Sequence, residues 1–446
     1  MMFKYFPHTP DDLAKMQDAL GIKELNDLFR DVPKDVFFQR EYQLPSALSE
    51  AELRSYFEAI ANENQKFVCF AGMGVYDHID PAVVKALTSR QEFLTAYTPY
   101  QPEVSQGTLQ YIFEFQSMIQ TLTGMDAANA SMYDGATATA EAAFMAEAIT
   151  KRKRILISNT VNPNTVDTIK TYAYFKGLEV DMVPEHEGVT DTKALKEKLT
   201  EDIACLIVQK PNMYGVIEMI APLSDLVHAQ GGILIENADI STLGVLKTPR
   251  EEGADIACGD CQSLGLPMAF GGPSVGYLAT LKNYVRKLPG RIVGMSKDQL
   301  GRRAFVLTLQ AREQHIRREK ANSNICSNQS LMALAVTIYL ATVGPEGLKK
   351  VNELSYQGAH YLMDRLEKTG YFQRAFAKPF LKEFVVRSMI PLPVLHEALF
   401  KNNLFGAIPV APEDPDKENL VSFAVTEKRS KAEIDRLIEV LEGLSW

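Results

Sequence analysis

The chain has 446 residues, of which 46% are hydrophobic, and a formal net charge of −9 at pH 7. This length and composition allow a sizeable core and favour more than one domain. The acidic balance argues against general nucleic-acid binding and suits a soluble cytoplasmic protein. Residues 1–10 carry one lysine and no long apolar run, so no signal peptide is predicted. Five scattered cysteines argue against a secreted disulfide framework.

Residues 1–65 are predicted to form a mostly polar helical arm, with helices that begin after Thr9 and Ser49. Such an arm either packs on a neighbouring subunit or forms a pair of surface helices on its own subunit. The sequence pattern favours neither arrangement over the other.

Short apolar segments alternate with helical segments from residue 154 onward. Continuous apolar strands joined by helices predict a mainly parallel sheet that is covered on both faces. We therefore expect a large α/β domain over residues 66–328. The predicted strands are residues 154–158, 179–183, 203–209, 233–235, 254–258 and 275–281, and the predicted helices are residues 164–176, 195–199 and 223–229.

The pattern changes after residue 328, and residues 329–446 are predicted to form a smaller α+β domain. Its apolar stretch at residues 331–343 is too short to span a bilayer and is predicted to be a buried helix, so no membrane partner is expected. The other predicted elements are helices at residues 347–368 and 431–444 and strands at residues 383–387 and 420–425.

Residues 134–139 (DGATAT) open a helix that is rich in alanine. The free N–H groups at a helix start suit a phosphate. The carboxylate of Asp134 would instead cap the helix and repel a phosphate dianion. We favour the helix cap over phosphate binding at this position.

A buried strand ends with two carboxylates, Glu236 and Asp239. In enzymes that use pyridoxal phosphate, an acidic group at such a strand end pairs with the pyridinium nitrogen. Either residue fits that position. The alternative, which we favour slightly, is a carboxylate bonded to loop amides at the edge of a sheet.

The glycine- and proline-rich turn at residues 265–273 is where a Schiff-base lysine would be expected, near Pro267 or Met268. Neither residue can form an imine. No lysine occurs between Lys247 and Lys282, and Lys210 follows an earlier strand. We expect Lys210 and Lys247 to be solvated.

Two further features of the sequence each have a structural interpretation as well as a functional one. Cys258 and Cys261 form a C-x-x-C pattern without a second ligand pair, so we expect two partly buried thiols and no metal site. The basic run at residues 312–320 either meets an anion or forms a solvated helix face paired with Glu313 and Glu319. Composition alone does not separate those two readings.

Three long segments together resemble glycine decarboxylase, the P-protein of the glycine cleavage system. They are residues 97–107 (YTPYQPEVSQG), 289–298 (PGRIVGMSKD) and 312–326 (REQHIRREKANSNIC). The resemblance extends over nearly the whole chain. It implies the pyridoxal-phosphate-dependent transferase fold of the aspartate-aminotransferase type, fold type I.

The family occurs either as one long chain with two homologous halves or as two separate subunits, and this chain is similar to the first half. The resemblance implies that the partner subunit carries the lysine and the pyridoxal phosphate, and that this chain has no Schiff-base lysine and no cofactor-binding residues of its own. It also implies glycine as substrate, the lipoylated H-protein as a partner and a hetero-assembly such as a heterotetramer.

Active sites of this fold lie near a subunit interface, so a half without the lysine can still contribute groups. The predicted residues are Tyr97, Tyr100, Glu103 and Ser105, with His315, Arg318 and Asn324 as second choices. Their expected roles are positioning, phosphate contact and shaping the lipoyl channel.

Three hypotheses follow. The chain completes a shared active site, or it is a structural and docking subunit that stabilises the partner and holds the H-protein, or it is a self-sufficient enzyme that uses Lys247 or Lys210. The third is disfavoured, because neither lysine has the expected placement.

Overall fold

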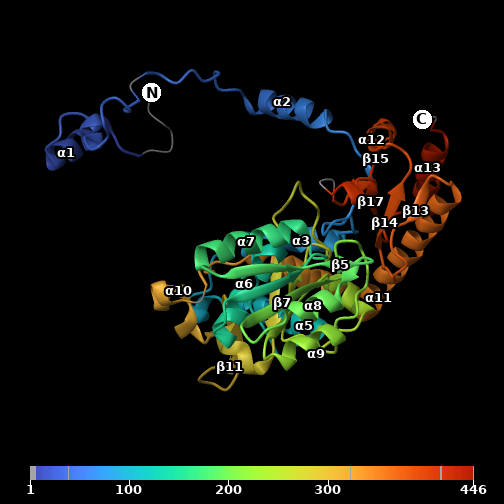
Figure 1. The fold of residues 1–446 in the computed structure, drawn as a ribbon. Coiled ribbons are helices and arrows are strands. Elements are labelled where there is room, and N and C mark those ends of the chain that lie inside the picture. Colours follow the sequence, from blue (N-terminus) through green and yellow to red (C-terminus); the bar gives the residue numbers. More distant parts are fainter. Residues whose placement is uncertain (1–6, 39, 322, 412–413, 445–446) are drawn as a thin grey trace. The chain divides into compact units, whose positions relative to one another are not determined.

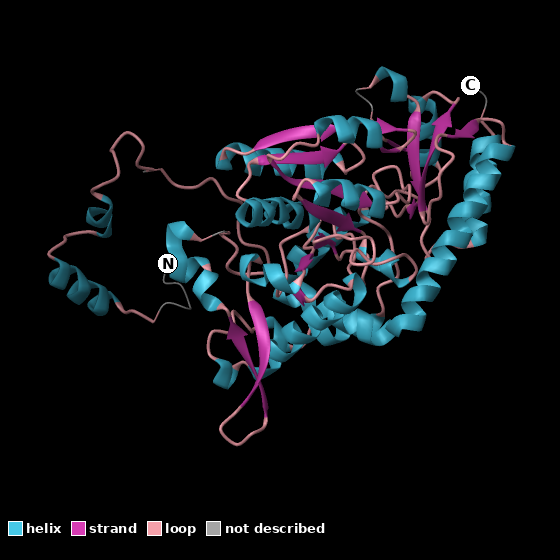
Figure 2. Ribbon diagram, turned by 60° about the horizontal axis from the view of Figure 1, so that its bottom comes forward, coloured by secondary structure: helices cyan, strands magenta, loops and turns pink. Residues whose placement is uncertain are grey.

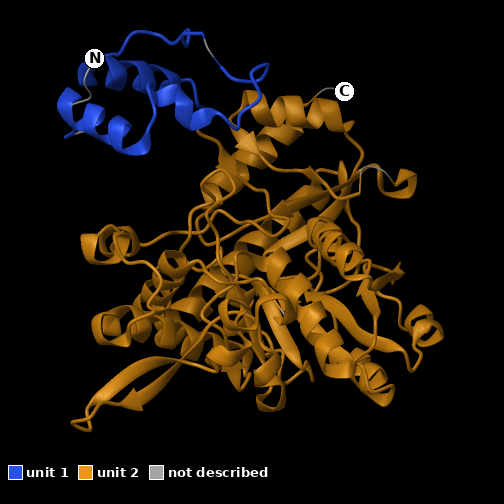
Figure 3. Cartoon of the chain, turned by 90° about the vertical axis from the view of Figure 1, so that its left-hand side faces the viewer, with its two compact units in different colours: residues 1–65 blue, residues 66–446 orange. Residues whose placement is uncertain are grey.

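The computed structural model describes residues 7–38, 40–321, 323–411 and 414–444. The chain divides into two compact units, residues 1–65 and 66–446 (Figure 3). The first unit contains α1 (Pro10–Leu20) and α2 (Glu50–Asn62), joined through the 3-10 helix η1 (Leu25–Phe29). Thr9 and Ser49 each cap the following helix in a capping box, which confirms the two predicted helix starts.

A seven-stranded sheet forms the centre of the second unit, in the order β2-β10-β9-β8-β7-β3-β4 (Figure 1). Neighbours from β9 to β4 are parallel, whereas β10 is antiparallel to both β9 and β2. The predicted mainly parallel sheet is confirmed. Its strands are β2 (Ala127–Ala128), β3 (Arg154–Ser158), β4 (Glu179–Val183), β7 (Ile203–Lys210), β8 (Ile233–Ala238), β9 (Ile256–Asp260) and β10 (Gly276–Thr280).

Both faces of this sheet are buried. Alternate residues of each strand point to opposite sides, so each strand contributes to an apolar core on either face. On β3, Leu156 belongs to one apolar core, and Ile155 and Ile157 belong to another. The first core also contains side chains of α3 (Ala82–Thr88), α5 (Gln106–Thr123), α8 (Thr192–Lys198) and α9 (Ala221–Ala229), and the second contains side chains of α6 (Gly135–Thr150) and α7 (Pro163–Lys176).

A four-stranded antiparallel sheet with its own core follows in the C-terminal part of the chain, in the order β13-β14-β17-β16. Phe70 also packs in that core, and β1 (Val68–Cys69) pairs with β15 (Leu404–Phe405). The start of the second unit therefore packs on its end. The remaining elements of this part are β13 (Phe372–Arg374), β14 (Glu383–Ser388), α12 (Leu392–Lys401), β16 (Ile408–Pro409), β17 (Leu420–Ala424) and α13 (Lys431–Glu442).

The two helices predicted at residues 331–343 and 347–368 are joined in α11 (Ser330–Lys368), which bends at Gly344. Gly344 has φ 61° and ψ −176°, and Pro345 follows it. Proline lacks an N–H group and disfavours helical geometry at the preceding residue, which explains the bend. By length and composition alone, α11 could span a membrane, but Val336 and Tyr339 lie in the core beside the seven-stranded sheet, as expected for a core helix.

The hairpin of β11 (Ile292–Lys297) and β12 (Arg303–Thr308) was not predicted from the sequence (Figure 2). Its root packs beside α5, with Val293 and Phe305 buried against Leu109 and Ile112. The other short elements are α4 (Gln91–Leu94), η2 (Pro102–Val104), β5 (Glu185–His186), β6 (Val189–Thr190), η3 (Ile240–Gly244), η4 (Lys282–Lys287), η5 (Gln310–Arg312), α10 (Gln314–Arg317), η6 (Arg318–Lys320) and η7 (Pro415–Lys417).

Gly215 tests how closely the chain packs on β14 of the four-stranded sheet, and Gly177 serves as the control. Gly215 has φ +74°, and a Cβ there would lie 2.0 Å from the backbone oxygen of Glu383. Gly177 has φ +64° with no atom within 4 Å of its Cβ position. We expect Gly177→Ala to lower the free energy of unfolding by about 1 kcal/mol, and Gly215→Ala to lower it by roughly 2–3 kcal/mol more, because backbone must move. Urea unfolding measures both, and equal losses would contradict the packing described.

Candidate functional site

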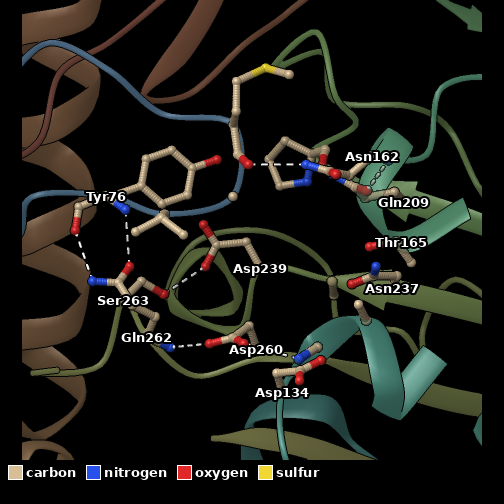
Figure 4. A pocket seen from close by; sticks show the side chains of 17 residues that line it. Tyr76, Asp134, Asn162, Thr165, Gln209, Asn237, Asp239, Asp260, Gln262 and Ser263 are labelled. Atoms are coloured by element: carbon tan, nitrogen blue, oxygen red, sulfur yellow. Dashed lines mark hydrogen bonds between the residues drawn. The ribbon is translucent and has the colours of Figure 1, made fainter. Parts of the chain in front are cut away.

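The main candidate site is a cavity of about 260 Å³ at the carboxyl edge of the seven-stranded sheet (Figure 4). Ligands of open α/β sheets bind at this edge, because loops leave the strands there. The lining residues come from the ends of β7, β8 and β9, the starts of α6 and α7, and the loop before α3. They are residues 73–76, 134–136, 237–239 and 262–263 with Asn162, Thr165, Gln209, Pro211 and Asp260.

Carboxylates occupy the N-terminus of α6 at the floor of this cavity. Asp134 accepts a hydrogen bond from the backbone N–H of Thr137 at 2.8 Å, which confirms the predicted helix cap. The backbone N–H of Gly135 donates to Asp260 Oδ2 at 2.9 Å. Burial raises the pKa of Asp260. Two of the N–H groups that a phosphate would use are therefore already bonded to carboxylates.

Asp239, which follows β8, is held by a buried lysine from the other sheet. Lys382 Nζ lies 2.6 Å from Asp239 Oδ2, and the Lys382 side chain is 3% exposed. Ser241 and Ser263 donate hydroxyl hydrogen bonds to Asp239 Oδ1. Burial raises the pKa of Asp239, but the Lys382 ammonium and the hydrogen bonds from Lys382 and Ser241 together lower it to about 2.

The same lysine connects the loop before α3 to the four-stranded sheet. Lys382 Nζ lies 3.1 Å from His78 Nε2 and 3.9 Å from the centre of the Tyr76 ring. His78 Nδ1 is 2.6 Å from Glu427 Oε2, and the Tyr76 hydroxyl donates to Glu383 at 2.7 Å. Burial and the Lys382 charge lower the pKa of His78. These contacts fix the loop that forms one wall of the cavity.

None of the described residues that line the cavity is a lysine or an arginine. Lys247 is exposed, as expected, but the expectation that Lys210 is solvated was wrong. The Lys210 side chain is 1% exposed and pairs with Glu252 at 3.2 Å and with Glu236 at 3.5 Å. Burial raises the pKa of Glu236 to about 7. Of the two predicted carboxylates, Asp239 lines the cavity, whereas Glu236 points into the core and pairs with Lys210.

The turn in which a Schiff-base lysine was expected lies outside the lining of the cavity. Pro267 and Met268 do not line the cavity, whereas Gln262 and Ser263 do. Gln262 exchanges hydrogen bonds with the backbone of Tyr76, which closes the cavity wall between β9 and the loop before α3.

The C-x-x-C pattern is structural. Cys258 and Cys261 are both fully buried, rather than partly buried as expected. Burial raises the pKa of both thiols. Among the residues that the structure describes, no group of His, Cys, Asp and Glu side chains is arranged to hold a metal ion.

Two of the predicted site residues meet outside the cavity, around a buried arginine. The guanidinium of Arg291, which is 3% exposed, lies 5.1 Å from the centre of the Tyr100 ring and donates to the Tyr100 hydroxyl at 3.2 Å. The Tyr100 and His315 rings are 6.3 Å apart. Glu313 lies 3.7 Å from Arg291 and 3.6 Å from His315. We call Tyr100, Arg291, Glu313 and His315 the Arg291 cluster.

The other predicted residues lie apart from that cluster or at its margin. Tyr97 is 79% exposed, and its hydroxyl is 3.4 Å from Ser327 Oγ. Glu103 is exposed, and Ser105 precedes α5 and is half-buried. Arg318 and Asn324 line a second cavity of about 410 Å³. None of the seven predicted residues lines the first cavity.

The basic run is used in two different ways. Arg312 donates to the backbone oxygens of Leu288 and Gly290, and its expected partner Glu313 pairs with Arg291 and His315 instead. Arg318 is exposed beside the second cavity. The run is therefore neither a uniform anion site nor a simple paired helix face.

The profile of the glycine cleavage system P-protein family matches residues 3–441. The chain belongs to this family. Relatives named probable glycine dehydrogenase (decarboxylating) subunit 1 are 48% identical over 443 residues in Carboxydothermus hydrogenoformans and 47% identical over 444 residues in Anoxybacillus flavithermus. Both alignments cover 99% of this chain and 99% of the relative.

Solved structures agree with this family and with the predicted fold. The crystal structure of a glycine decarboxylase (P-protein) of the glycine cleavage system, in inhibitor-bound form, has a TM-score of 0.90 and 43% identity, with 99% of each chain covered. A glutamate decarboxylase of Lactobacillus brevis has a TM-score of 0.70 at 13% identity, with 92% of this chain and 97% of the other covered. The fold is that of pyridoxal-phosphate-dependent enzymes of fold type I, as predicted.

The residues of the P-protein chain around the first cavity do not fit pyridoxal phosphate. The N-terminus of α6 is bonded to Asp134 and Asp260, which would repel the phosphate. Asp239, one of the two carboxylates predicted as a partner for a pyridinium nitrogen, is already neutralised by Lys382. No lysine is present among the described lining residues to hold the aldehyde.

The ion pair of Asp239 and Lys382 is testable by substitution. We expect Lys382→Met to lower the free energy of unfolding by roughly 3–5 kcal/mol, because the Asp239 charge stays buried without a partner. The double variant Lys382→Met, Asp239→Asn should recover much of that loss.

Lys401→Met is the matched control. Its pair with Glu397 is 2.6 Å long but 70% and 65% exposed, so we expect a change within about 0.5 kcal/mol. Urea unfolding of the variants gives the comparison. A loss at Lys382 no larger than at Lys401 would contradict the role of the buried pair.

Glu141, in the second cavity, gives a pH dependence. Burial raises the pKa of Glu141 from 4.5 to about 7. The stability that the protonated Glu141 side chain contributes is present below pH 4.5 and is lost as the pH rises through 7. The reason is that the carboxyl group loses its proton at a lower pH in the unfolded chain than in the folded chain. We expect the free energy of unfolding of Glu141→Gln to exceed that of the parent by roughly 1–3 kcal/mol at pH 8 and to match it near pH 4.5.

The measurement is urea unfolding of parent and variant at several pH values. Glu147→Gln, on the same helix α6, is the control and should show no such pH-dependent gain. An equal difference between Glu141→Gln and the parent at every pH would show that burial does not perturb this carboxyl.

Proposed function

We propose that this chain is the subunit of a two-subunit glycine decarboxylase that does not carry the cofactor. Its partner is the second, lysine-bearing P-protein subunit, and the chain is inactive alone. The observation that carries the proposal is the first cavity, whose described lining has carboxylates and no lysine although the chain has the family fold along its full length. The complex acts on glycine in the bacterial cytoplasm and transfers its aminomethyl group to the lipoyl group of the H-protein.

Pyridoxal phosphate, bound by the partner subunit, supplies the electron sink for loss of carbon dioxide from glycine. This chain contributes by presenting the Arg291 cluster and the exposed loop that contains Tyr97 to the partner's site. In this proposal Tyr97, Tyr100, Glu103 and Ser105 line the shared site. His315, Arg318 and Asn324 lie toward the path of the lipoyl arm.

The Arg291 cluster supports this role because the N–H donors of Arg291 are not all used within the described part of the chain, although Glu313 faces its charge. Nε and Nη1 of Arg291 have no hydrogen-bond partner among the described residues, although the side chain is 3% exposed. Leaving buried guanidinium donors unpaired is unfavourable, so such a group is expected to meet a further acceptor. Tyr100, which covers Arg291, is 53% exposed and available to a partner.

The second candidate function is a structural and docking subunit that stabilises the partner and positions the H-protein. The N-cap role of Asp134 favours the docking function, because its carboxylate occupies the helix N-terminus where a phosphate would bind. The two functions differ in which kinetic constant responds to changes in the Arg291 cluster.

The test is Tyr100→Phe and His315→Ala in this chain, assembled with the lysine-bearing partner. We expect each to lower kcat for glycine decarboxylation by about tenfold or more, because groups that position reactants act in the transition state. Tyr174→Phe and His186→Ala, both exposed residues elsewhere on the chain, should leave kcat unchanged.

Sedimentation of each complex shows whether the subunits remain assembled. An unchanged kcat with a raised KM for the H-protein would reject the shared active site in favour of docking. Unchanged kcat and KM in an intact complex would reject both roles for the Arg291 cluster.

A further inference from the structure

We infer that the first cavity binds a small molecule through a primary ammonium group. The cavity is lined by three carboxylates, Asp134, Asp239 and Asp260, and by no cationic side chain among the described residues (Figure 4). Lys382, which does not line the cavity, neutralises Asp239. The other two carboxylates have no such cationic partner within the described part of the chain. The cavity therefore favours an organic cation and disfavours an anion.

Unused hydrogen-bond acceptors in the cavity match the three N–H donors of an ammonium group. Thr165 is 7% exposed, and its hydroxyl bonds no other described residue. The side-chain amide of Asn237 likewise has no partner within the described residues, and both side chains line the cavity (Figure 4). Asp134 uses Oδ1 to cap α6, which leaves Oδ2 for a ligand.

The other two carboxylates are already engaged within the chain, so we place the ammonium group at these three residues. Asp260 Oδ2 accepts from Gly135, and Oδ1 accepts from Gln262 and Ser274. Asp239 accepts from Ser241, Ser263 and Lys382.

The remaining lining fixes the kind of cation. A metal ion is disfavoured, because no suitable group of ligating side chains occurs among the residues described. The volume of about 260 Å³ restricts the ligand to a small metabolite. This inference does not depend on the proposed decarboxylase role, because it concerns only this chain's own cavity.

Calorimetric titration of the purified full chain tests the inference. The probes are ethylammonium and glycinamide, compared with tetramethylammonium, acetate and inorganic phosphate at equal ionic strength. We expect the two primary ammonium compounds to bind with millimolar dissociation constants, at least about tenfold more tightly than tetramethylammonium, which has no N–H to donate. Acetate and phosphate should not bind.

Two pairs of variants locate the binding. Asp134→Asn keeps the helix cap, because asparagine caps as well as aspartate, and should weaken glycinamide binding by about tenfold or more. Asp191→Asn changes the N-cap of α8 outside the cavity and should leave binding unchanged.

Thr165→Val should weaken binding by roughly three- to fivefold, whereas Thr168→Val, on the same helix but outside the cavity lining, should not. The Thr165 pair keeps the test valid if Asp134→Asn does not fold. Three results would overturn the inference. They are no ammonium binding at concentrations up to about 50 mM, phosphate binding as tight as that of glycinamide, and glycinamide binding that none of the cavity substitutions alters.

Discussion

The ion pair between Lys382 and Asp239 joins the two sheets of the second unit at the edge of the first cavity. An ammonium taken out of water needs a close counter-charge, so the residue before β14 and the residue after β8 must stay together. The loop that contains Tyr76 and His78 is fixed by the same lysine. The shape of the cavity and the electrostatic state of its wall therefore depend on one buried contact.

That contact also explains how a fold of pyridoxal-phosphate enzymes can have a cavity that does not suit the cofactor. In such enzymes a carboxylate at this strand end pairs with a pyridinium cation. In this chain Asp239 is paired with Lys382, and two further carboxylates bond the N–H groups at the N-terminus of α6, where a phosphate would bind. The chain has the fold of these enzymes, but the charges around its cavity do not suit the cofactor. The Arg291 cluster, outside the cavity, retains an arginine with unused donors and is the place where we propose that function now resides.

The sequence predicted the parallel sheet well, because continuous apolar strands and capped helices leave strong local patterns. The boundaries of β4 and the caps Thr9, Ser49 and Asp134 were all correct. It failed where the outcome depends on distant partners. Lys210 looked solvated because its counter-charges, Glu236 and Glu252, are remote in sequence. Lys382 was missed for the same reason, since its partner Asp239 lies on the other sheet. The β11–β12 hairpin was missed because its exposed strands lack a clear alternation of apolar residues.

The central claim is that this chain does not itself hold pyridoxal phosphate through a lysine. The most direct measurement is borohydride reduction of the complex of this chain with its lysine-bearing partner, in the presence of pyridoxal phosphate, followed by mapping of the modified lysines. The account predicts a stoichiometric adduct on the partner and none on this chain. A single stoichiometric adduct on Lys210, Lys247 or Lys382 would contradict it and would make this chain a cofactor-bearing enzyme in its own right.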